Sequence, residues 1–502
     1  MFSSNLSKIQ RWIVLAIVSS ALFMIVIDMT VLYSVLPRLT HDLAASASEK
    51  LWIVNIYPLV MAGLLLGLGT LGDRLGHKKL FVMGLTIFGL ASLIAAYAPT
   101  PLVLIAARTL LAIGAAMMMP ATLSIIRTTF SDERERSLAV GIWASVSSVG
   151  AGMGPLVGGF LLEHFWWGSV FLINIPIVIL ALFLAILLIP NLKGNKNKKW
   201  DFIGSVQIMI GLVALVYAVK EISRREGSIA VAVLSAVIGV VAMIIFMRHQ
   251  RKSQNPLIDF ALFRDSHFST GVATALLSCF ALIGMELIVT QRLQLVLGYT
   301  PLEAGLYVVF TSIASFISGI LIGLVLHRVD KVKVQWVCLL VSGIGMGTLL
   351  LFHDGNIFLQ FAALMILGAG LGGAMTAASN SIMLNVPVEQ AGMAASIEEV
   401  SFELGSALSI TLLGSLSSFI YTASLVVPDG LTVPPIVRDS LDEALLAAKN
   451  MPTDAGSALV ETAQSAFDQS FIVVLATATI LLLASAFIIR AVSKRKSSIL
   501  EQ

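Results

Sequence analysis

The chain carries little charge for its length. Asp, Glu, Lys and Arg make up 12% of its 502 residues, hydrophobic residues make up 57%, and the mean hydropathy is +0.94. Water-soluble domains contain about 25% charged residues, so this scarcity excludes an ordinary soluble protein. Long apolar runs with few charges are typical of helices in lipid, whereas membrane barrels are built from short alternating strands. The composition therefore predicts an all-α membrane protein.

Cysteines and catalytic groupings are also scarce. The two cysteines, Cys279 and Cys338, both lie in apolar segments, which argues against a disulfide framework. No nucleophile–base pair, metal-ligand cluster or phosphate-binding loop stands out, and the glycine-rich run at 368–373 lies inside an apolar segment rather than after a strand. We therefore expect no enzymatic activity, no bound metal or cofactor, and no nucleic-acid partner.

What is present is a series of fourteen apolar segments. If they cross the membrane alternately from a cytoplasmic N-terminus, most of the 32 Lys and Arg residues fall on the cytoplasmic side, as the positive-inside rule requires. The first segment follows Lys8 and Arg11 as a signal peptide would, but its length and Asp28 indicate a retained span. The segments cover residues 12–34, 51–71, 80–98, 102–126, 138–162, 169–189, 202–219, 229–247, 268–297, 303–326, 334–352, 357–384, 393–421 and 470–491.

These spans are predicted to form six, a pair, and six more. We expect an N-terminal six-helix bundle in 1–192, a linker with two additional transmembrane helices in 193–252, and a C-terminal six-helix bundle in 253–502. Similar basic loops at 69–79 and 323–333 support two equivalent halves, as in many secondary transporters. The external stretch 220–226 is basic and departs from the charge rule.

The one long external segment covers residues 422–469. Ser440 to Glu443 has the pattern of a capping box before an apolar-periodic stretch that reaches about 450. A second helical stretch is expected at about 454–468. The sequence thus predicts an extracellular helical hairpin, which is either a passive connector or a gating element.

The loop after the second span has a distinctive order of glycine, acidic and basic residues. Its glycines allow a tight turn, and Asp73 is suited to complement a helix N-terminus or a basic residue of the other half. Such a contact would break as the halves rock and would bias the direction that the protein faces. The loop resembles the signature of the major facilitator superfamily. The alternative interpretation is a plain basic loop that only follows the topology rules. The matching positions are Gly69, Asp73, Arg74, Gly76, Lys78 and Lys79.

The fifth span carries glycines at every fourth position. Gly150, Gly154 and Gly158 line one helix face and allow another backbone to approach closely, while Pro155 frees a carbonyl and bends the helix. This pattern resembles the antiporter motif of proton-coupled drug exporters in the superfamily; a general packing face is the alternative. Arg108 in span four matches the basic residue of a further family motif. It is expected to pair with Asp28, either to tune proton release or as a structural pair.

The branch of the family is indicated by the segments 28–37, 51–57, 116–123 and 174–176. They resemble the fourteen-span drug:proton antiporters of the QacA and SmvA type, which export quaternary ammonium compounds and antiseptics. The resemblance implies a major facilitator fold and coupling to the proton-motive force. Those pumps commonly carry Asp where this chain has Asn55, and an acid of some relatives is missing from 311–318, so we expect a preference for monovalent cations.

Five carboxylates lie inside predicted spans and away from their first and last residues, where they are costly and therefore candidates for function. A carboxyl group in apolar surroundings holds its proton readily, and a cation about 5 Å away favours its release by about 3.3 kcal/mol at an effective dielectric near 20. One site could thus hold either a drug or a proton. Glu399 and Glu403 share a helix face, whereas Glu398 points elsewhere. The candidates for proton and substrate coupling are Asp28, Glu286, Glu398, Glu399 and Glu403.

Each of these acids also has a structural interpretation. For Glu399 the alternative is a buried structural hydrogen bond, and for Asp28 it is a cap or an anchor of its span. For Glu286 the alternative is a structural polar cluster with Gln291, Arg292 and Gln294. The substrate pocket is expected to be apolar and adaptable, with aromatic side chains for cation–π contacts. Its candidate residues are Trp52, Asn55, Tyr57, Met118 and Phe402.

The sequence as a whole predicts a proton-coupled multidrug efflux antiporter. Its substrates would be lipophilic cations such as quaternary ammonium antiseptics, biguanides and cationic dyes, and it would act as a monomer in the bacterial inner membrane with both termini in the cytoplasm. Two alternatives stay open. One is a proton-coupled exporter of an endogenous metabolite, lipid or siderophore, and the other is a non-transporting membrane sensor or scaffold.

Overall fold

The structure is a computed structural model that describes residues 7–45, 47–191, 194, 200–223, 228–253, 256–427, 433–438 and 440–500. Over these residues, fourteen helical segments are long and apolar enough to cross a membrane, which confirms the predicted number of spans and the all-α fold. Most of the linker 193–199, part of the basic stretch 220–226, and Pro428 lie outside the described residues.

The long helices follow one another with short connections. One predicted span, the sixth, consists of the two consecutive helices α6 and α7. The helices are α1 (Lys8–Asp42), α2 (Ala47–Leu75), α3 (His77–Ala96), α4 (Pro101–Thr129), α5 (Glu133–His164), α6 (Ser169–Leu172), α7 (Asn174–Leu188), α8 (Phe202–Ser223), α9 (Ile229–Lys252), α10 (Ser266–Gln291), α11 (Pro301–Val325), α12 (Lys331–Phe352), α13 (Ile357–Leu384), α14 (Ala391–Ser424), α15 (Leu441–Ala448) and α16 (Thr453–Leu500).

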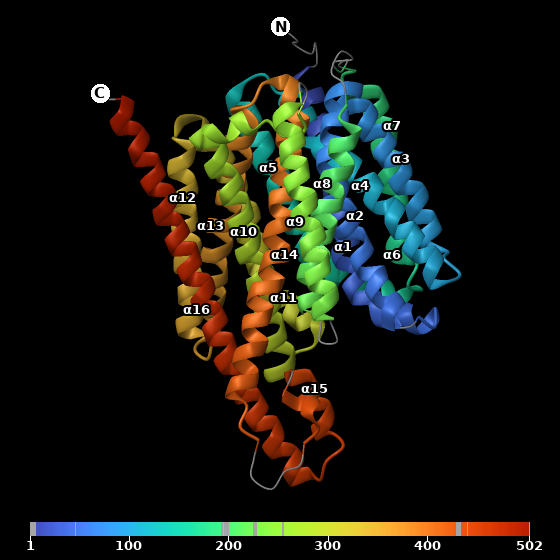
Figure 1. Ribbon diagram of the computed structural model, residues 1–502, viewed down its shortest axis with the longest axis vertical. Coiled ribbons are helices and arrows are strands. Elements are labelled where there is room, and N and C mark those ends of the chain that lie inside the picture. Colours follow the sequence, from blue (N-terminus) through green and yellow to red (C-terminus); the bar gives the residue numbers. More distant parts are fainter. Residues whose placement is uncertain are drawn as a thin grey trace.

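Two six-helix bundles lie side by side (Figure 1). The first contains α1 to α7, and the second contains α10 to α14 together with α16. The start of α1 and the end of α16 lie at one face of the molecule, here named the terminal face, and α15 lies at the opposite end, here named the hairpin face (Figure 1). The position of each residue within the membrane is described below by its distance from these two faces.

The glycine face of α5 packs against α1, as the sequence predicts. A Cβ atom added at Gly150 would lie 3.0 Å from the side chain of Val26, and one added at Gly154 would lie 2.0 Å from the Thr30 hydroxyl. Gly158 is buried on the same face, and Pro155 lies within the helix. Larger side chains would force α1 and α5 apart, so the glycines set the distance between these helices.

The additional helices α8 and α9 pack against each other, and α8 contacts both α2 and α14. The Trp200 indole N–H donates to the carbonyl of Gly67 at 2.9 Å, and Cβ atoms at Gly63 and Gly67 would clash with α8. Asp201 joins the two helices at the terminal face, because it accepts hydrogen bonds from Gln250 at 2.8 Å and His249 at 3.0 Å. Helix α8 therefore touches both bundles.

Burial alone would raise the pKa of Asp201. The hydrogen bonds from the Gly204 amide, Gln250 and His249 outweigh this effect and hold the pKa below its ordinary value. A lowered pKa means that the folded state favours the ionised form. The stabilisation by Asp201 is therefore complete at neutral pH and is lost as the pH falls through the pKa of the folded state.

We predict that Asp201→Asn lowers the apparent Tm of the purified protein at pH 7 by about 2 °C. The difference from the wild type should shrink as the pH is lowered towards 3, because the wild-type carboxylate then becomes protonated. Asp454→Asn, which changes an exposed acid on the hairpin face, is the control. A difference that stays constant over this pH range would contradict the assignment.

The hairpin differs from the prediction in two ways. The expected separate helix at 454–468 is the first part of α16, which runs unbroken to Leu500, because residues 457–500 contain no Gly or Pro. The capping box is also wrong, since the Ser440 side chain makes no capping hydrogen bond to α15. It lines a cavity below the hairpin instead.

Candidate functional site

A buried ion pair lies in the first bundle, towards the hairpin face. Arg108 of α4 donates from Nη1 to Oδ2 of Asp28 on α1 at 2.9 Å, and both side chains are almost fully buried. Asn174 of α7 donates from Nδ2 to the other carboxylate oxygen at 3.3 Å. The predicted pairing of Arg108 with Asp28 is confirmed, and the pair has its charges and hydrogen bonds largely satisfied within the bundle.

Tyr57 of α2 belongs to the same group, here named the Asp28 cluster: Asp28, Tyr57, Arg108 and Asn174. The guanidinium carbon of Arg108 lies 4.7 Å from the centre of the Tyr57 ring, and the ring is fully buried. One face of this ring is therefore already occupied by a cation of the protein itself. Because the ring is fully buried, the expected substrate contact at Tyr57 is not open in this conformation.

A second group of acids lies across from this cluster, on the second bundle. Glu399 and Glu403 of α14 share a helix face, and their charges both act on Cys279 of α10, as does that of Glu286 on the same helix. We name Cys279, Glu286, Glu399 and Glu403 the acidic strip. Glu399 is 3% exposed, and its Oε1 accepts no hydrogen bond from any described residue.

The structure also shows the surroundings of the other two candidate acids, Glu398 and Glu286. Glu398 is fully buried and accepts a hydrogen bond from Ser379 of α13, so it points away from the strip, as the helix geometry predicts. The proposed polar cluster around Glu286 is not formed with Arg292. Arg292 instead pairs with Asp354 and with Asp468, so Glu286 stays with the strip.

The Asp28 cluster and the acidic strip are electrostatically connected. The charges of Asp28, Arg108 and Glu403 all act on the hydroxyl group of Tyr57. This hydroxyl is buried and has no hydrogen-bond partner among the described residues. Tyr57 is therefore within electrostatic range of an acid from each bundle.

The bundles are held together towards the terminal face. Asp73, at the end of α2, accepts a hydrogen bond from the Gly392 amide in the first turn of α14 at 2.9 Å. The predicted contact between Asp73 and a helix N-terminus is thus confirmed, and that terminus belongs to the other bundle. Gly69 lies one turn earlier, where an added Cβ would be 1.7 Å from the Ser396 hydroxyl. Only glycine allows the helices this close.

The remaining residues of the loop have separate positions. Gly76 has φ of +97°, a conformation that favours glycine and makes the turn between α2 and α3. Lys78 donates to the carbonyl of Ile186 at 2.7 Å, within the first bundle. Arg74 and Lys79 are exposed.

Two more contacts join the bundles. The hydroxyl groups of Ser148 on α5 and Ser315 on α11 lie 2.9 Å apart, near the middle of both helices. Lys331 and Glu133 form an ion pair at 3.0 Å at the terminal face. In this conformation the bundles are therefore closed from the terminal face to mid-depth.

The expected pocket residues differ in their exposure. Trp52 is 42% exposed, and Asn55 and Phe402 are half-buried. Met118 is fully buried, and its Cγ would lie 2.7 Å from a Cβ added at Gly84. It therefore fills the contact between α3 and α4 and does not face the strip, which corrects its assignment to the pocket in this conformation.

Comparison with known proteins decides the family. A sequence profile described as the Major Facilitator Superfamily matches residues 18–410. The chain belongs to the major facilitator superfamily. It is a transporter and not an enzyme, as predicted.

Two relatives match along nearly the whole chain. The methyl viologen resistance protein SmvA of Salmonella typhimurium is 39% identical over 477 residues, which are 94% of this chain and 96% of SmvA. The multidrug efflux pump LfrA of Mycolicibacterium smegmatis is 34% identical over 496 residues, which are 98% of each protein. The predicted resemblance to this branch of the superfamily is confirmed.

A solved structure supports the fold alone. The human organic anion transporter MFSD10 superposes with a TM-score of 0.62 at 12% identity, over 95% of this chain and all of that one. The two chains therefore share the same overall fold.

Sequence reasoning missed several residues that join the two bundles between the terminal face and mid-depth. Gly392, Ser396 and Ser315 are small residues in apolar helices, and nothing in their own sequence surroundings distinguishes them from packing residues. Their partners Asp73 and Gly69 were found through the loop motif. The spacing of Gly392 and Ser396 by four residues was the available signal, since both lie on one face of α14.

We predict that cysteines at positions 148 and 315 form a disulfide when a membrane-permeant oxidant is added. The two hydroxyl oxygens are close enough that thiols in their place should meet the geometry of a disulfide. The double variant Ser148→Cys with Ser315→Cys is made in a background of Cys279→Ser and Cys338→Ala, and peptide mass spectrometry detects the cross-link. Ser148→Cys with Ser409→Cys is the control, because Ser409 contacts α10. Two reactive but uncross-linked thiols at 148 and 315 would count against this closed conformation.

Proposed function

We propose that the protein exports lipophilic monovalent cations from a bacterial cell in exchange for protons. The names of SmvA and LfrA refer to methyl viologen resistance and to multidrug efflux, which supports export of drugs by this chain. The expected monomer and the location in the inner membrane belong to the same proposal. In this assignment the terminal face is cytoplasmic.

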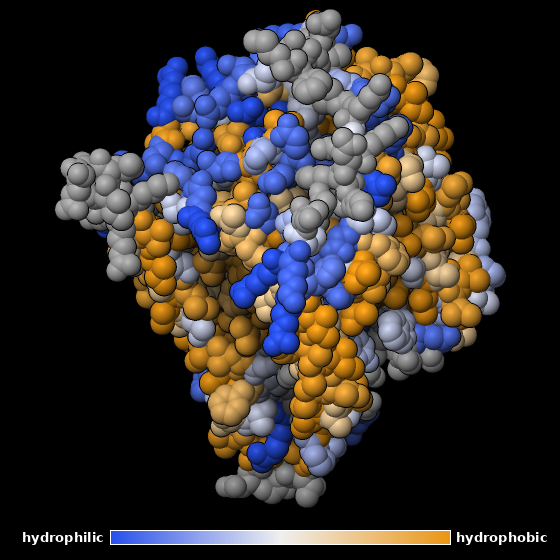
Figure 2. All heavy atoms as spheres, turned by 45° about the horizontal axis from the view of Figure 1, so that its top comes forward, coloured by the Kyte–Doolittle hydropathy of each residue, from blue (hydrophilic) through white to orange (hydrophobic). Residues whose placement is uncertain are grey.

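The orientation is supported by the distribution of charge. Figure 2 shows hydrophilic side chains gathered over the terminal face and hydrophobic side chains covering the flanks. Basic residues in cytoplasmic loops set the orientation of membrane proteins. Those at or near the terminal face include Arg74, Lys79, Arg134, Arg248, Arg251, Lys252, Arg328 and Lys333.

One observation carries the proposed coupling: Glu399 is buried beside other acids and forms no ion pair with a basic residue in the described part of the chain. The charges acting on it are those of Glu398 and Glu403. Acids this close resist simultaneous ionisation, and no described Lys or Arg forms an ion pair with Glu399. A proton or a cationic substrate would each relieve the repulsion, so we assign to Glu399 the site that the two share.

Asp28 has a different role in this proposal. Arg108 already neutralises it, so it has less need of a proton or of a substrate than Glu399. We propose that the Asp28–Arg108 pair responds to protonation or substrate binding at the acidic strip. Tyr57 would transmit this effect, because the charge of Glu403 acts on its hydroxyl group. A cation near the strip would repel Arg108 and weaken its contact with the ring.

The closed contacts at the terminal face supply the conformational part of the cycle. Asp73–Gly392 and Lys331–Glu133 hold the bundles together here, and both would have to break for a substrate to enter from the cytoplasm. The glycine contact of α5 with α1 lies inside one bundle and would stay intact. We propose that the bundles rock as units about the middle of α5 and α11.

The coupling is tested by Glu399→Gln in inside-out membrane vesicles with an imposed pH gradient. A carboxylate about 5 Å from a cation stabilises it by roughly 3 kcal/mol at an effective dielectric near 20. We expect the variant to bind ethidium up to about 100-fold more weakly and to show no acceleration by the pH gradient. Glu461→Gln, an exposed acid of α16, is the matched control.

Two results would speak against the proposal. Gradient-driven ethidium transport by Glu399→Gln at the wild-type rate would remove Glu399 from the coupling. Wild-type transport that ignores the pH gradient would remove proton exchange altogether.

The proposed preference for monovalent over divalent cations is tested by introducing, at position 55, the acid that related pumps carry. Asn55→Asp should increase transport of a dication such as methyl viologen relative to ethidium, because a second carboxylate offsets the second charge. Asn55→Gln is the control for a changed side chain without charge. An equal ratio of the two substrates in the wild type and in Asn55→Asp would contradict the proposed preference.

A further inference from the structure

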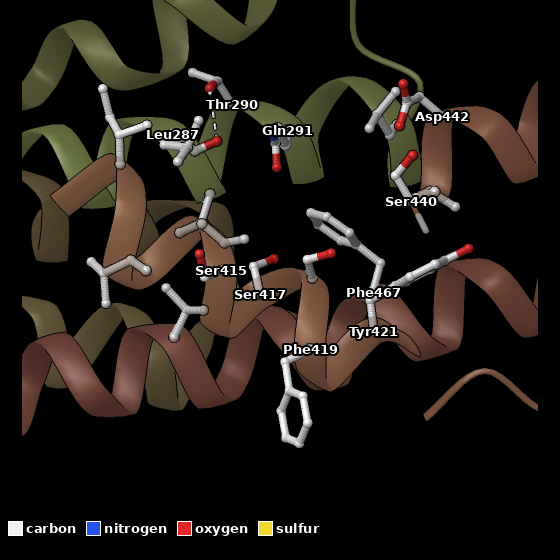
Figure 3. A pocket seen from close by; sticks show the side chains of 18 of the residues that line it. Leu287, Thr290, Gln291, Ser415, Ser417, Phe419, Tyr421, Ser440, Asp442 and Phe467 are labelled. Atoms are coloured by element: carbon white, nitrogen blue, oxygen red, sulfur yellow. Dashed lines mark hydrogen bonds between the residues drawn. The ribbon is translucent and has the colours of Figure 1, made fainter. Parts of the chain in front are cut away.

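A cavity of about 1000 Å³ lies at the hairpin face, away from the acidic strip (Figure 3). It is bounded by α10, α14 and α16, and the start of α15 closes part of its outer side. None of the residues of the strip lines it. Pockets that bind small molecules have volumes of about 300–1,000 Å³, so a drug-sized molecule would fit.

The cavity begins where the close contact of α10 with α14 ends. The Ser409 hydroxyl of α14 donates to the carbonyl of Phe280 at 2.6 Å, and a Cβ added at Gly284 would lie 2.3 Å from Leu413. Gly284 and Leu413 line the deepest part of the cavity. Beyond this point the two helices leave a space between them.

Both helix ends are fixed in these positions. Arg292, in the π-helical turn Arg292–Val296 that continues α10, donates to Asp468 of α16 at 2.7 Å and also pairs with Asp354. On α14, the hydroxyl of Ser417 lies 2.7 Å from that of Ser470 on α16. The cavity is thus a built part of the second bundle, because partly buried polar contacts between α10, α14 and α16 hold its walls.

The outer side is closed by the hairpin. Tyr421 donates from its hydroxyl to the carbonyl of Val437 at 3.1 Å, which ties α14 to the turn before α15. Ser440, which makes no capping hydrogen bond, lines the cavity together with Asp442. Figure 3 shows the Phe467 ring pointing into the cavity and Phe419 pointing away from it.

The lining is apolar at depth and acidic at the outer end. Leu287, Ile410 and Val474 are aliphatic, Gln291 is polar, and Asp442 is a carboxylate beside a second acid, Glu443. No Lys or Arg is among the described residues that line the cavity. An aromatic ring at the centre and carboxylates at the mouth are suited to a cation with an apolar body.

We propose that this cavity binds an amphipathic ammonium compound, with its apolar chain between α10 and α14 and its ammonium group near Asp442. Two sources share this chemistry. One is the exported cation on its way out, which rests on the proposed function, and the other is an ammonium-bearing phospholipid of the outer leaflet. The binding itself requires no transport.

The experiment measures binding of dodecyltrimethylammonium by the full chain purified in dodecyl maltoside. The background variant is Glu399→Gln, which weakens binding at the acidic strip. Gly414 lines the cavity, and an added Cβ would meet only Leu287 at 3.9 Å, so Gly414→Phe should fill the space without a clash with the backbone. We expect Gly414→Phe to weaken binding by at least about tenfold. Asp442→Asn should weaken it by about threefold to fivefold, because the carboxylate is exposed to solvent.

Each variant has a matched control. Gly159→Phe places the same side chain where an added Cβ has no neighbour within 4 Å, on α5. Asp454→Asn removes an acid from the first turn of the other helix of the hairpin, so it reproduces the loss of a helix N-terminal charge without touching the cavity. Both controls should bind as the background variant does.

The outcomes distinguish an exported cation from a phospholipid as the ligand, and they distinguish the cavity site from proton-coupled export. Competition by added phosphatidylethanolamine would support the site and identify a lipid source, whereas its absence would support the site with the exported cation as its ligand. Unchanged binding in both Gly414→Phe and Asp442→Asn would overturn the inference. Because binding is measured without a pH gradient, a failure of proton coupling would leave this result standing.

Discussion

The structure depends on how acids are accommodated among apolar helices. A carboxylate that leaves water must find a cation, hydrogen bonds or a proton. Asp28 has the first two, through Arg108 and Asn174. Glu399 has neither a described basic partner nor a hydrogen bond to its Oε1, and its closest charges are those of other acids. In the proposed function, this difference makes Glu399, and not Asp28, the acid that a proton or a cationic substrate would neutralise.

The fold places the Asp28 cluster and the acidic strip on opposite bundles. α1, α2 and α4 carry the satisfied pair, and α10 and α14 carry the strip, while the bundles touch from the terminal face to mid-depth through Asp73–Gly392 and Ser148–Ser315. Tyr57 lies within reach of the charges on both sides. In the proposed cycle, a change of protonation on α14 would therefore act across the interface between the bundles, where Gly69 and Gly392 allow α2 and α14 to lie in close contact.

The sequence predicts the spans because twenty-residue apolar runs have few alternatives in lipid. It predicts the pairing of Arg108 with Asp28 because a base inside one span lowers the cost of an acid inside another. It also predicts the kind of partner for Asp73, although not Gly392 itself, which is an ordinary small residue 319 positions away. The local patterns were less reliable. Ser440 has the capping sequence but lines a cavity, and Met118 fills a helix contact, because tertiary packing overrides a local pattern in both places.

The central claim is that proton and substrate compete for Glu399, and proton release on binding tests it most directly. Ethidium is added to the purified protein in weakly buffered detergent solution near pH 7, and the change in pH is recorded. The account predicts that the wild type releases protons as it binds the dye and that Glu399→Gln releases fewer at equal occupancy. Equal proton release by both proteins at equal occupancy would contradict it.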